Sequence, residues 1–149
     1  IQSDENYIGE GRLYIGLNRI RVEYHSPEKI LIILDKNKAM YYNYNLDEDE
    51  FFDPSDTSAW FFFDIFNNPD FFIKSNIKEE NNSLILKKRG VNDLGNYEIN
   101  IILEDSPLII RKIKLNLENS SFVISIFNHR YNESFNRDFF KLINPSFFN

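Results

Sequence analysis

Two histidines are the side chains of this sequence best suited to acid–base catalysis. His25 lies two residues after Glu23 on the polar side of a predicted strand, and His129 precedes Arg130. The histidines are far apart in the sequence, and no cysteine or glycine-framed serine supplies a nucleophile. We therefore interpret both histidines as solvated surface residues, and we expect no catalytic residue and no enzyme activity.

One short stretch is rich in carboxylates, which are the ligands that calcium prefers. Its spacing does not fit a calcium-binding EF-hand loop, because it has no glycine at the turn and no final glutamate in register. The chain has only five glycines and no glycine-rich loop that would cradle a phosphate. We interpret the stretch as a charged turn and expect no bound metal and no cofactor. Its carboxylates are Asp47, Glu48, Asp49, Glu50 and Asp53.

Composition excludes several further classes of protein. The net charge of −6 comes without any basic run, so a nucleic-acid partner is not expected. No apolar run approaches the roughly 18 residues that a membrane-spanning helix needs. The chain begins with Ile1 and shows no basic-then-apolar leader. Removal of a signal peptide and trimming of the chain both explain this start.

The stretch from residue 11 to residue 46 has the clearest structural pattern. Ile20, Val22 and Tyr24 alternate with polar residues, as in a strand with one buried face. The next two runs, 30–34 and 39–44, are apolar on both parities, which is more than a sheet with one buried face requires. We interpret this excess as the wall of a container for an apolar molecule.

Short strands recur along the whole chain and are separated by turn residues such as Asp35–Asn37, Glu80–Asn82 and Asn92–Gly95. This spacing predicts an antiparallel barrel, a sandwich or an open half-barrel. No repeat or linker is evident, so we expect residues 1–149 to form a single domain. The predicted strands are about 11–17, 20–26, 29–35, 38–45, 48–52, 71–78, 83–89, 96–104, 107–118, 121–129 and 135–143.

One aromatic segment departs from the strand pattern. Residues 53–59 offer helix-capping side chains, and residues 67–69 (Asn-Asn-Pro) end a helix well. We predict a helix between them, although phenylalanine and tryptophan also favour strands. Helical phasing places four residues on one face, with Trp60 at its edge. The four are Ala59, Phe62, Phe63 and Phe66.

The order of several segments resembles the periplasmic outer-membrane lipoprotein carrier (LolA) family in its alphaproteobacterial form. A Gly-x-Leu-aromatic-Ile strand at Gly11–Ile15 is followed by Arg21–Tyr24 and by Pro27. An apolar strand ending at Asp35, the segment Tyr42–Asp47 and the closing phrase Phe140–Phe148 come next. The resemblance extends from about Gly9 to Phe148 and rests on order and spacing.

The resemblance implies a mainly β fold with a helical lid, in which an open, unclosed antiparallel half-barrel is covered on its concave face. It also implies that acyl chains bind between the lid and the sheet. The pattern of the residues concerned, taken alone, favours a packed core, whereas the resemblance favours acyl-chain binding, and both interpretations can hold at once. They are Leu13, Ile15, Ile20, Val22, Met40, Tyr42, Trp60, Phe62, Phe63 and Phe66.

The implied function is transport in the periplasm. A carrier of this family takes acylated lipoproteins from an inner-membrane ABC transporter and delivers them to an outer-membrane receptor, and we expect it to be a monomer. The alternatives are the receptor of the same pathway, a binder of other lipids, and a lipoprotein-carrier-like sensor domain that carries nothing. A hydrolase is the weakest alternative.

The sequence departs from the family pattern near the second strand. The family's Arg-Pro pair aligns with Leu17 and Asn18, with one residue missing before Arg19. The arginine that latches the family's lid is therefore replaced by Arg19 or by nothing. The Asp-Gly of the following turn is Asp35-Lys36 here, and the family's first helix would precede Ile1.

Overall fold

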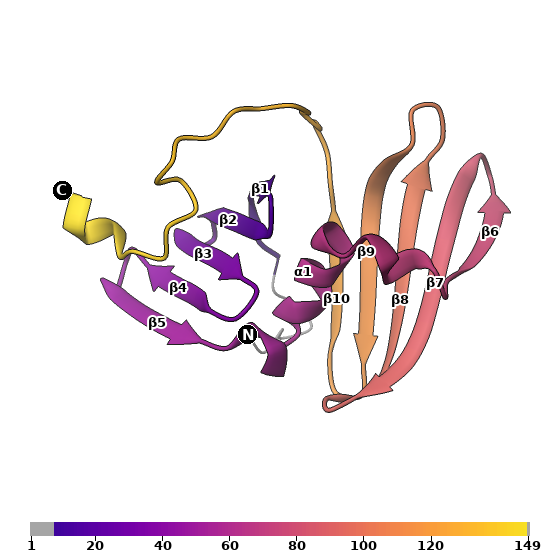
Figure 1. The fold of residues 1–149 in the computed structure, drawn as a ribbon, viewed down its shortest axis with the longest axis horizontal. Coiled ribbons are helices and arrows are strands. Elements are labelled where there is room, and N and C mark those ends of the chain that lie inside the picture. Colours follow the sequence, from indigo (N-terminus) through magenta and orange to yellow (C-terminus); the bar gives the residue numbers. More distant parts are fainter. Residues whose placement is uncertain (1–7, 149) are drawn as a thin grey trace. The chain divides into compact units, whose positions relative to one another are not determined.

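A computed structural model describes residues 8–148 and shows ten strands and one α-helix in that range. The chain divides into two compact units. The α1 unit comprises Ile8–Pro69 and the C-terminal segment that begins at Ser134, and the β6–β10 unit comprises Asp70–Glu133. Each unit contains a five-stranded antiparallel sheet in which consecutive strands are neighbours (Figure 1). The prediction of a mainly β chain with one helix and unclosed sheets is confirmed.

The sheet of the α1 unit agrees with the sequence prediction to within two residues at every strand end. The β3–β4 hairpin closes at the predicted turn, where the backbone N–H of Asp35 donates to the carbonyl of Lys38 at 2.8 Å. Its strands are β1 (Glu10–Gly16), β2 (Arg19–Ser26), β3 (Ile30–Asp35), β4 (Ala39–Asn43) and β5 (Glu48–Phe52).

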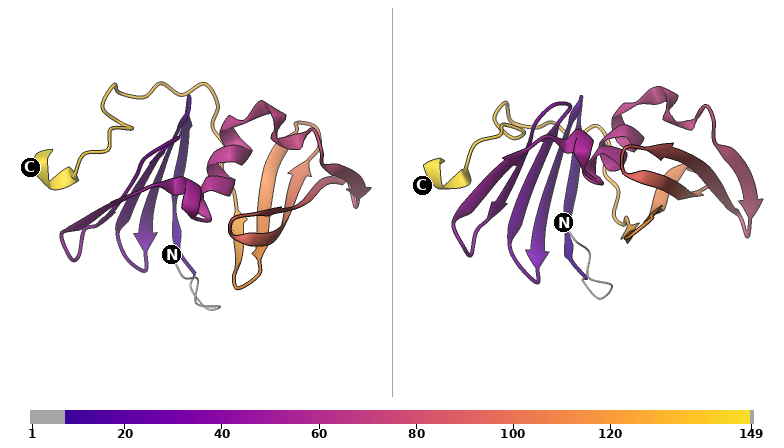
Figure 2. Two further views of the ribbon diagram at one scale, coloured as in Figure 1. Left: turned by 60° about the horizontal axis from the view of Figure 1, so that its bottom comes forward. Right: turned by 90° about the horizontal axis from the view of Figure 1, so that it is seen from below.

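Both faces of this sheet are covered, and Figure 2 shows the helix and the C-terminal segment on opposite sides of it. The first face carries Ile32 and Leu34 of β3 towards the helix. The second face carries Leu31 and Ile33, against which Leu142 of the C-terminal segment packs. A strand that is buried on both faces needs apolar side chains on both parities. The double coverage therefore explains the excess of apolar residues that the sequence shows in this region.

The helix α1 (Ala59–Asn67) occupies the aromatic segment, as predicted. At its start the backbone N–H of Ala59 donates to Oγ1 of Thr57 at 3.2 Å. At its end the backbone N–H of Asn68 donates to the carbonyl of Asp64 at 2.9 Å. A short 3-10 helix, η1 (Pro54–Asp56), precedes it. Capping by threonine and termination before proline explain the boundaries of α1.

The prediction of a strand at 135–143 is wrong. Within 134–148 the chain forms turns and one 3-10 helix, η3 (Pro145–Phe148), and it crosses the second face of the sheet as a strap. The guanidinium Nη1 of Arg21 donates to the carbonyl of Phe139 at 2.7 Å, and the rings of Phe139 and Tyr14 lie 4.9 Å apart. The apolar side chains of this C-terminal strap thus pack onto a sheet face, a pattern that the sequence alone does not distinguish from a strand.

The sheet of the β6–β10 unit is a meander joined by tight turns. Asn81 and Asn82 have positive φ values of 50° and 63°, which suits a two-residue hairpin turn. The predicted strand at 71–78 is only partly confirmed, because Pro69–Phe72 form the 3-10 helix η2. The strands are β6 (Asn76–Glu80), β7 (Ser83–Asn92), β8 (Gly95–Glu104), β9 (Ile109–Leu117) and β10 (Ser121–Ser125).

This second sheet has one apolar and one polar face. Ile99 and Ile101 of β8 are buried and pair with Leu115 and Ile113 of β9. The opposite face carries charged residues, among them Glu98, whose Oε2 lies 2.6 Å from Nε of Arg89. Such alternation is typical of an antiparallel sheet with one buried face.

Two further expectations bear on the chain as a whole. No helix within residues 8–148 is both long enough and apolar enough to span a bilayer. The N-terminal helix of the carrier family would precede Ile1 and so falls outside the described residues. The assignment of residues 1–149 to a single domain stays a prediction.

Candidate functional site

The helix α1 covers the first face of the β1–β5 sheet with aromatic side chains. Phe63 is only 5% exposed and belongs to the buried cluster on that face. Ala59, Trp60 and Phe66 pack against the same cluster. The rings of Trp60 and Phe63 stack, with centroids 5.6 Å apart and planes inclined by 20°. Because Trp60 is the only tryptophan of the chain and packs against this cluster, its fluorescence reports on the contact of α1 with the sheet.

The sheet surface beneath the helix is apolar. Its buried centre comes from β2, β3 and β4 and consists of isoleucine, leucine and alanine side chains: Ile20, Ile30, Ile32, Leu34 and Ala39. Partly buried residues surround this centre: Leu13, Val22, Tyr24, Tyr41 and Phe52. Contacts between such surfaces are non-directional, so one apolar partner can replace another at little cost. We call this surface, together with the facing side of α1, the helix-covered face.

Six of the ten residues predicted to bind acyl chains lie together at the helix-covered face: Leu13, Ile20, Val22, Trp60, Phe63 and Phe66. Ile15 lies at the end of β1 and is 39% exposed. Phe62 is half-buried, but it is not one of the described residues that pack against the cluster. The helical phase explains this, since Phe62 points about 100° away from Phe63 around the helix axis.

The prediction that Met40 and Tyr42 share this face is wrong. Both are buried in the cluster on the opposite face, beneath the C-terminal strap. The register through the β3–β4 hairpin pairs Leu34 with Ala39 and Ile33 with Met40, so the odd-numbered residues of β4 point towards the helix. Ala39 and Tyr41 therefore take the places expected for Met40 and Tyr42.

A hydrogen bond joins the end of α1 to the β1–β2 turn. The backbone N–H of Asn18 donates to Oδ1 of Asn67 at 3.0 Å. Nδ2 of Asn67 in turn donates to the carbonyl of Phe63 at 3.3 Å. Arg19 forms an ion pair with Asp35, and its place in β2 points it towards the second face. Arg19 therefore does not take the part of a latching arginine, and Asn18 with Asn67 connects the helix to the sheet.

Side chains of the C-terminal strap cover the second face of the sheet, where Tyr42 is buried and has a raised pKa. The guanidinium of Arg21 lies 4.4 Å from the ring centroid of Phe139. The hydroxyl of Tyr42 donates to Oδ1 of Asp47 at 2.6 Å. This hydrogen bond, aided by burial, raises the pKa of Tyr42 to about 12, because ionisation would place two negative charges side by side.

The two histidines have different environments. His25 is exposed, as predicted. His129 is half-buried, its Nε2 lies 2.7 Å from the carbonyl oxygen of Ile110, and its ring stacks on Tyr131. The interpretation of His129 as a solvated surface residue is therefore wrong, and its imidazole helps to fix the segment after β10.

Two carboxylates of the charged turn, Asp49 and Asp53, accept hydrogen bonds. Asp53 accepts hydrogen bonds from the hydroxyl and the backbone N–H of Ser55, which lower the pKa of its carboxyl. Asp49 accepts a hydrogen bond from Asn144 at 3.0 Å. Across residues 8–148, no three histidine, aspartate or glutamate side chains are grouped closely enough to hold a metal ion.

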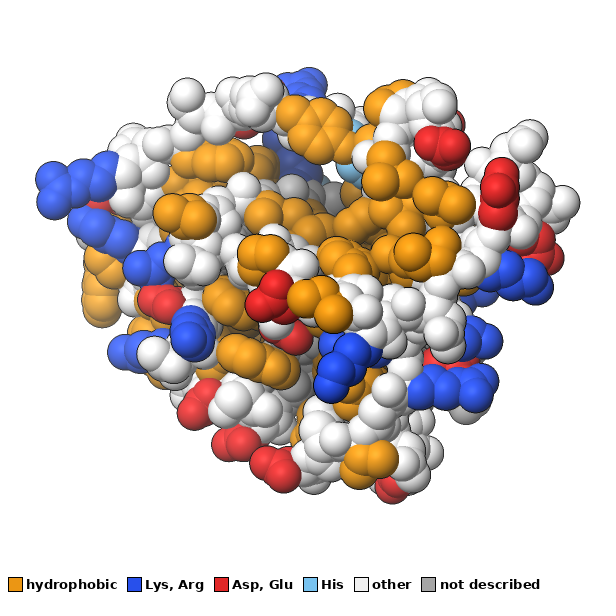
Figure 3. Space-filling model, turned by 45° about the vertical axis from the view of Figure 1, so that its right-hand side comes forward, with side chains coloured by type: hydrophobic (Ala, Val, Ile, Leu, Met, Phe, Trp, Pro, Cys, Tyr) orange, Lys and Arg blue, Asp and Glu red, His pale blue; other side chains and the backbone are white. Residues whose placement is uncertain are grey.

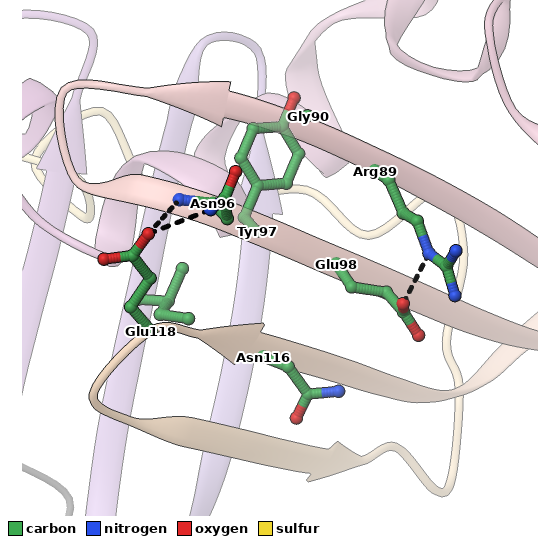
Figure 4. Close-up of a pocket in the computed structure, with 8 residues that line it drawn as sticks. Arg89, Gly90, Asn96, Tyr97, Glu98, Asn116 and Glu118 are labelled. Atoms are coloured by element: carbon green, nitrogen blue, oxygen red, sulfur yellow. Dashed lines mark hydrogen bonds and ion pairs between the residues drawn. The ribbon is translucent and has the colours of Figure 1, made fainter.

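The β6–β10 unit has a polar surface pocket of about 330 Å³ (Figure 4). Glu98 accepts hydrogen bonds from Asn100 and Arg89, and these lower the pKa of its carboxyl. Oε1 of Glu118 accepts from the backbone and the side chain of Asn96, at 3.1 and 3.0 Å. The carboxylates of this pocket are thus engaged with neighbouring side chains, which makes it a poor starting point for acid–base chemistry.

Large hydrophobic side chains also reach the surface, as the orange groups of Figure 3 show. Two of them lie in hairpin turns of the α1 unit: Leu17 between β1 and β2 is 90% exposed, and Leu46 between β4 and β5 is 63% exposed. Sequence patterns of strands and helices do not predict such residues, because an exposed turn has no periodicity.

Comparison with known families gives no matching family model for this chain. Comparison with curated proteins gives no match either. The likeness to the lipoprotein carrier family therefore rests on the order and spacing of segments between about Gly9 and Phe148.

Proposed function

We propose that the protein is a periplasmic carrier that shields the acyl chains of lipoproteins beneath α1. In this proposal the chain folds as a lipoprotein-carrier-like open half-barrel, and α1 is its movable lid. The observation that carries the proposal is the contact of an aromatic helix with a mainly apolar sheet surface. Phe63, Trp60 and Phe66 of this helix pack against the sheet, and one hydrogen bond from Asn18 joins its end to the β1–β2 turn.

The energetics of burial favour an exchange of the helix for acyl chains. Three partly or fully buried aromatic side chains represent about 5 kcal/mol. One buried methylene contributes about 0.8 kcal/mol, so about six methylenes offset the loss of these three aromatic contacts. Three full acyl chains represent on the order of 35 kcal/mol gross, whereas non-covalent binding saturates near about 20 kcal/mol. The carrier therefore shields its cargo only in part, which allows release.

The same arithmetic explains why such a carrier needs partners. A membrane buries acyl chains as well as the protein does, so extraction requires external work. An inner-membrane ABC transporter supplies that work in the proposed pathway, and an outer-membrane receptor accepts the cargo. Because apolar side chains line the helix-covered face, the cargo is selected by its acyl chains and not by its head group.

Reversible cross-linking of α1 tests the proposal. The chain has no cysteine, so the variant Leu17→Cys/Asn67→Cys carries a unique pair, with one thiol in the β1–β2 turn and one at the end of α1, in place of the Asn18–Asn67 hydrogen bond. A cleavable bis-maleimide joins the two thiols and holds the helix on the sheet. We expect the cross-linked protein to lose binding of a triacylated peptide and to regain it after cleavage. Each single-cysteine variant, treated with the same reagent, is the control and should bind throughout.

Acyl-peptide binding that is unchanged by the cross-link would contradict the proposal, because the chains would then bind elsewhere. A loss that also occurs in both single-cysteine controls would point to the reagent and not to closure of the helix. Trp60 fluorescence, recorded in the same titration, separates the two cases, since displacement of the helix removes Trp60 from the buried cluster of the sheet.

The second candidate function is the outer-membrane receptor of the same pathway. The observation that favours it is the exposure of Leu17 and Leu46 at hairpin turns, where an apolar side chain can enter a membrane. A receptor passes its acylated cargo to lipid vesicles without a further protein, whereas a carrier retains it. If Leu17→Ala and Leu46→Ala abolish such transfer, the receptor function is favoured.

A further inference from the structure

A second pocket of about 320 Å³ lies wholly within the α1 unit, between the start of β2 and the C-terminal strap. Three cationic and two apolar side chains line it: Arg19, Arg137, Lys141, Phe140 and Leu142. Arg19 belongs to the second face of the sheet, which is the face that α1 does not cover. The pocket is therefore separate from the helix-covered face.

The pocket holds more positive than negative charge. Arg19 pairs with Asp35, and Nζ of Lys141 lies 2.5 Å from Oδ1 of Asp138. Arg137 is exposed and makes no hydrogen bond or ion pair with any residue between 8 and 148. Three cations thus share two carboxylates. The net charge of the chain is −6, so this local excess of positive charge is opposite in sign to that of the whole protein. It attracts anions locally.

The apolar side of the pocket is held in place by the sheet. The ring of Phe140 lies so close to Gly16 that a Cβ there would stand 2.8 Å from the nearest ring carbon. Phe140 also makes edge-to-face contacts with Phe135 and Phe139, at centroid distances of 5.2 and 5.1 Å. Leu142 packs against the buried cluster of the second face. The pocket therefore presents a fixed apolar wall beside its cations.

We propose that this pocket binds a small anionic amphiphile, with its phosphate group at the three cations and a short alkyl part against Phe140 and Leu142. Guanidinium groups bind phosphate through paired N–H donors, and Arg137 has all of its donors available. The pocket volume lies at the lower end of the range for small-molecule sites. It therefore accommodates a head group with a few carbons and not a full acyl chain.

Isothermal titration calorimetry with n-hexyl phosphate, inorganic phosphate and n-hexanol tests this inference at low ionic strength. We expect hexyl phosphate to bind about tenfold more tightly than phosphate, because the alkyl part buries a few methylenes. We expect Arg137→Gln to weaken hexyl phosphate binding about tenfold, through loss of a charge-assisted contact. The matched control is Arg130→Gln, which removes an equally exposed arginine from the β6–β10 unit and should leave binding unchanged.

Equal binding by the Arg137→Gln variant and the unsubstituted protein would overturn the inference. So would equal affinity for phosphate and hexyl phosphate, which would indicate a plain anion site. Unfolding curves of both variants check that the fold is retained. Sedimentation with vesicles that contain phosphatidic acid distinguishes the source of the ligand. Binding to vesicles supports a lipid head group, and binding of hexyl phosphate alone supports a soluble phosphate ester.

Discussion

The backbone N–H of Asn18 donates a hydrogen bond to Oδ1 of Asn67 at 3.0 Å, and this contact joins the β1–β2 turn to the last residue of α1. An exposed hydrogen bond between neutral groups contributes about 1 kcal/mol, so it orients the helix without holding it firmly. A hydrogen bond of this strength suits the proposed function, in which α1 opens.

Replacing Asn67 by leucine keeps the size of the side chain and removes the hydrogen bond. We expect the amide protons of α1 to exchange about fivefold faster, which corresponds to a loss of about 1 kcal/mol in the free energy of local opening. Hydrogen exchange followed by mass spectrometry measures this effect. Asn116→Leu, at an exposed position of β9, is the control. Unchanged exchange in α1 would show that packing alone holds the helix.

The substitution Phe63→Ala, which removes the ring, should destabilise the α1 unit strongly. Phe63 is buried in the cluster of the helix-covered face, and deletion of a buried phenylalanine ring costs about 3–5 kcal/mol. Ile15→Ala should cost less, because Ile15 is 39% exposed and lies outside the buried centre of this face. Urea unfolding followed by Trp60 fluorescence measures both. Similar losses for the two variants would argue against the assignment of Phe63 to the core of this face.

Substitutions on the two faces of the β1–β5 sheet should lower stability alike but should differ in their effect on ligand binding. Met40→Ala and Leu34→Ala each leave a cavity and should lower the free energy of unfolding by about 2–5 kcal/mol. We expect only Leu34→Ala to change the affinity for an acylated peptide, because Met40 lies beneath the C-terminal strap. Titration of both variants with the same peptide makes the comparison, and a change caused by Met40→Ala alone would reverse the assignment of the faces.

Tyr42 should make the stability depend on pH in alkaline solution. Its pKa is raised from 10.0 to about 12 in the folded protein, so the unfolded chain releases the phenolic proton first as the pH rises. The contribution of Tyr42 is therefore complete below pH 10 and is lost between pH 10 and about pH 12. We expect the unfolding free energy of Tyr42→Phe to fall less steeply over this interval. Chemical unfolding at several pH values tests this, and identical slopes would contradict the Tyr42–Asp47 contact.

The length of the acyl chain should set a threshold for binding. Because about six methylenes offset the contacts of three aromatic side chains of α1 with the sheet, peptides that carry one chain of four carbons should not displace Trp60 from the buried cluster of the sheet. Chains of about twelve carbons or more should do so. Fluorescence titration over a series of chain lengths measures the threshold. A response that is independent of chain length would contradict an exchange of aromatic for acyl contacts.

Local signals predicted the hairpins and the helix well. Asparagine residues at the β6–β7 turn, and Thr57 before α1, specify these structures through backbone conformation and capping, which act over a few residues. The face of β4 was predicted wrongly because parity depends on the register across the β3–β4 turn. A change of one residue in that register moves Met40 and Ala39 to opposite sides of the sheet.

The C-terminal strap could not be predicted from the sequence for a different reason. Its partners Tyr14 and Arg21 are more than 100 residues away, and its apolar spacing is compatible with a strand. The cationic pocket could not be predicted for the same reason, because Arg19 and Arg137 line it together although they are far apart in the sequence. Only tertiary contacts bring these residues together, and a single sequence does not reveal them.

Native mass spectrometry of the protein with a triacylated lipoprotein, and with the same lipoprotein after removal of its acyl chains, tests the carrier function most directly. We expect a one-to-one complex with the acylated form and none with the deacylated form. Equal binding of both forms would show that the protein recognises the polypeptide. That result would favour a lipoprotein-carrier-like interaction domain over a carrier. It would also contradict the exchange of α1 for acyl chains.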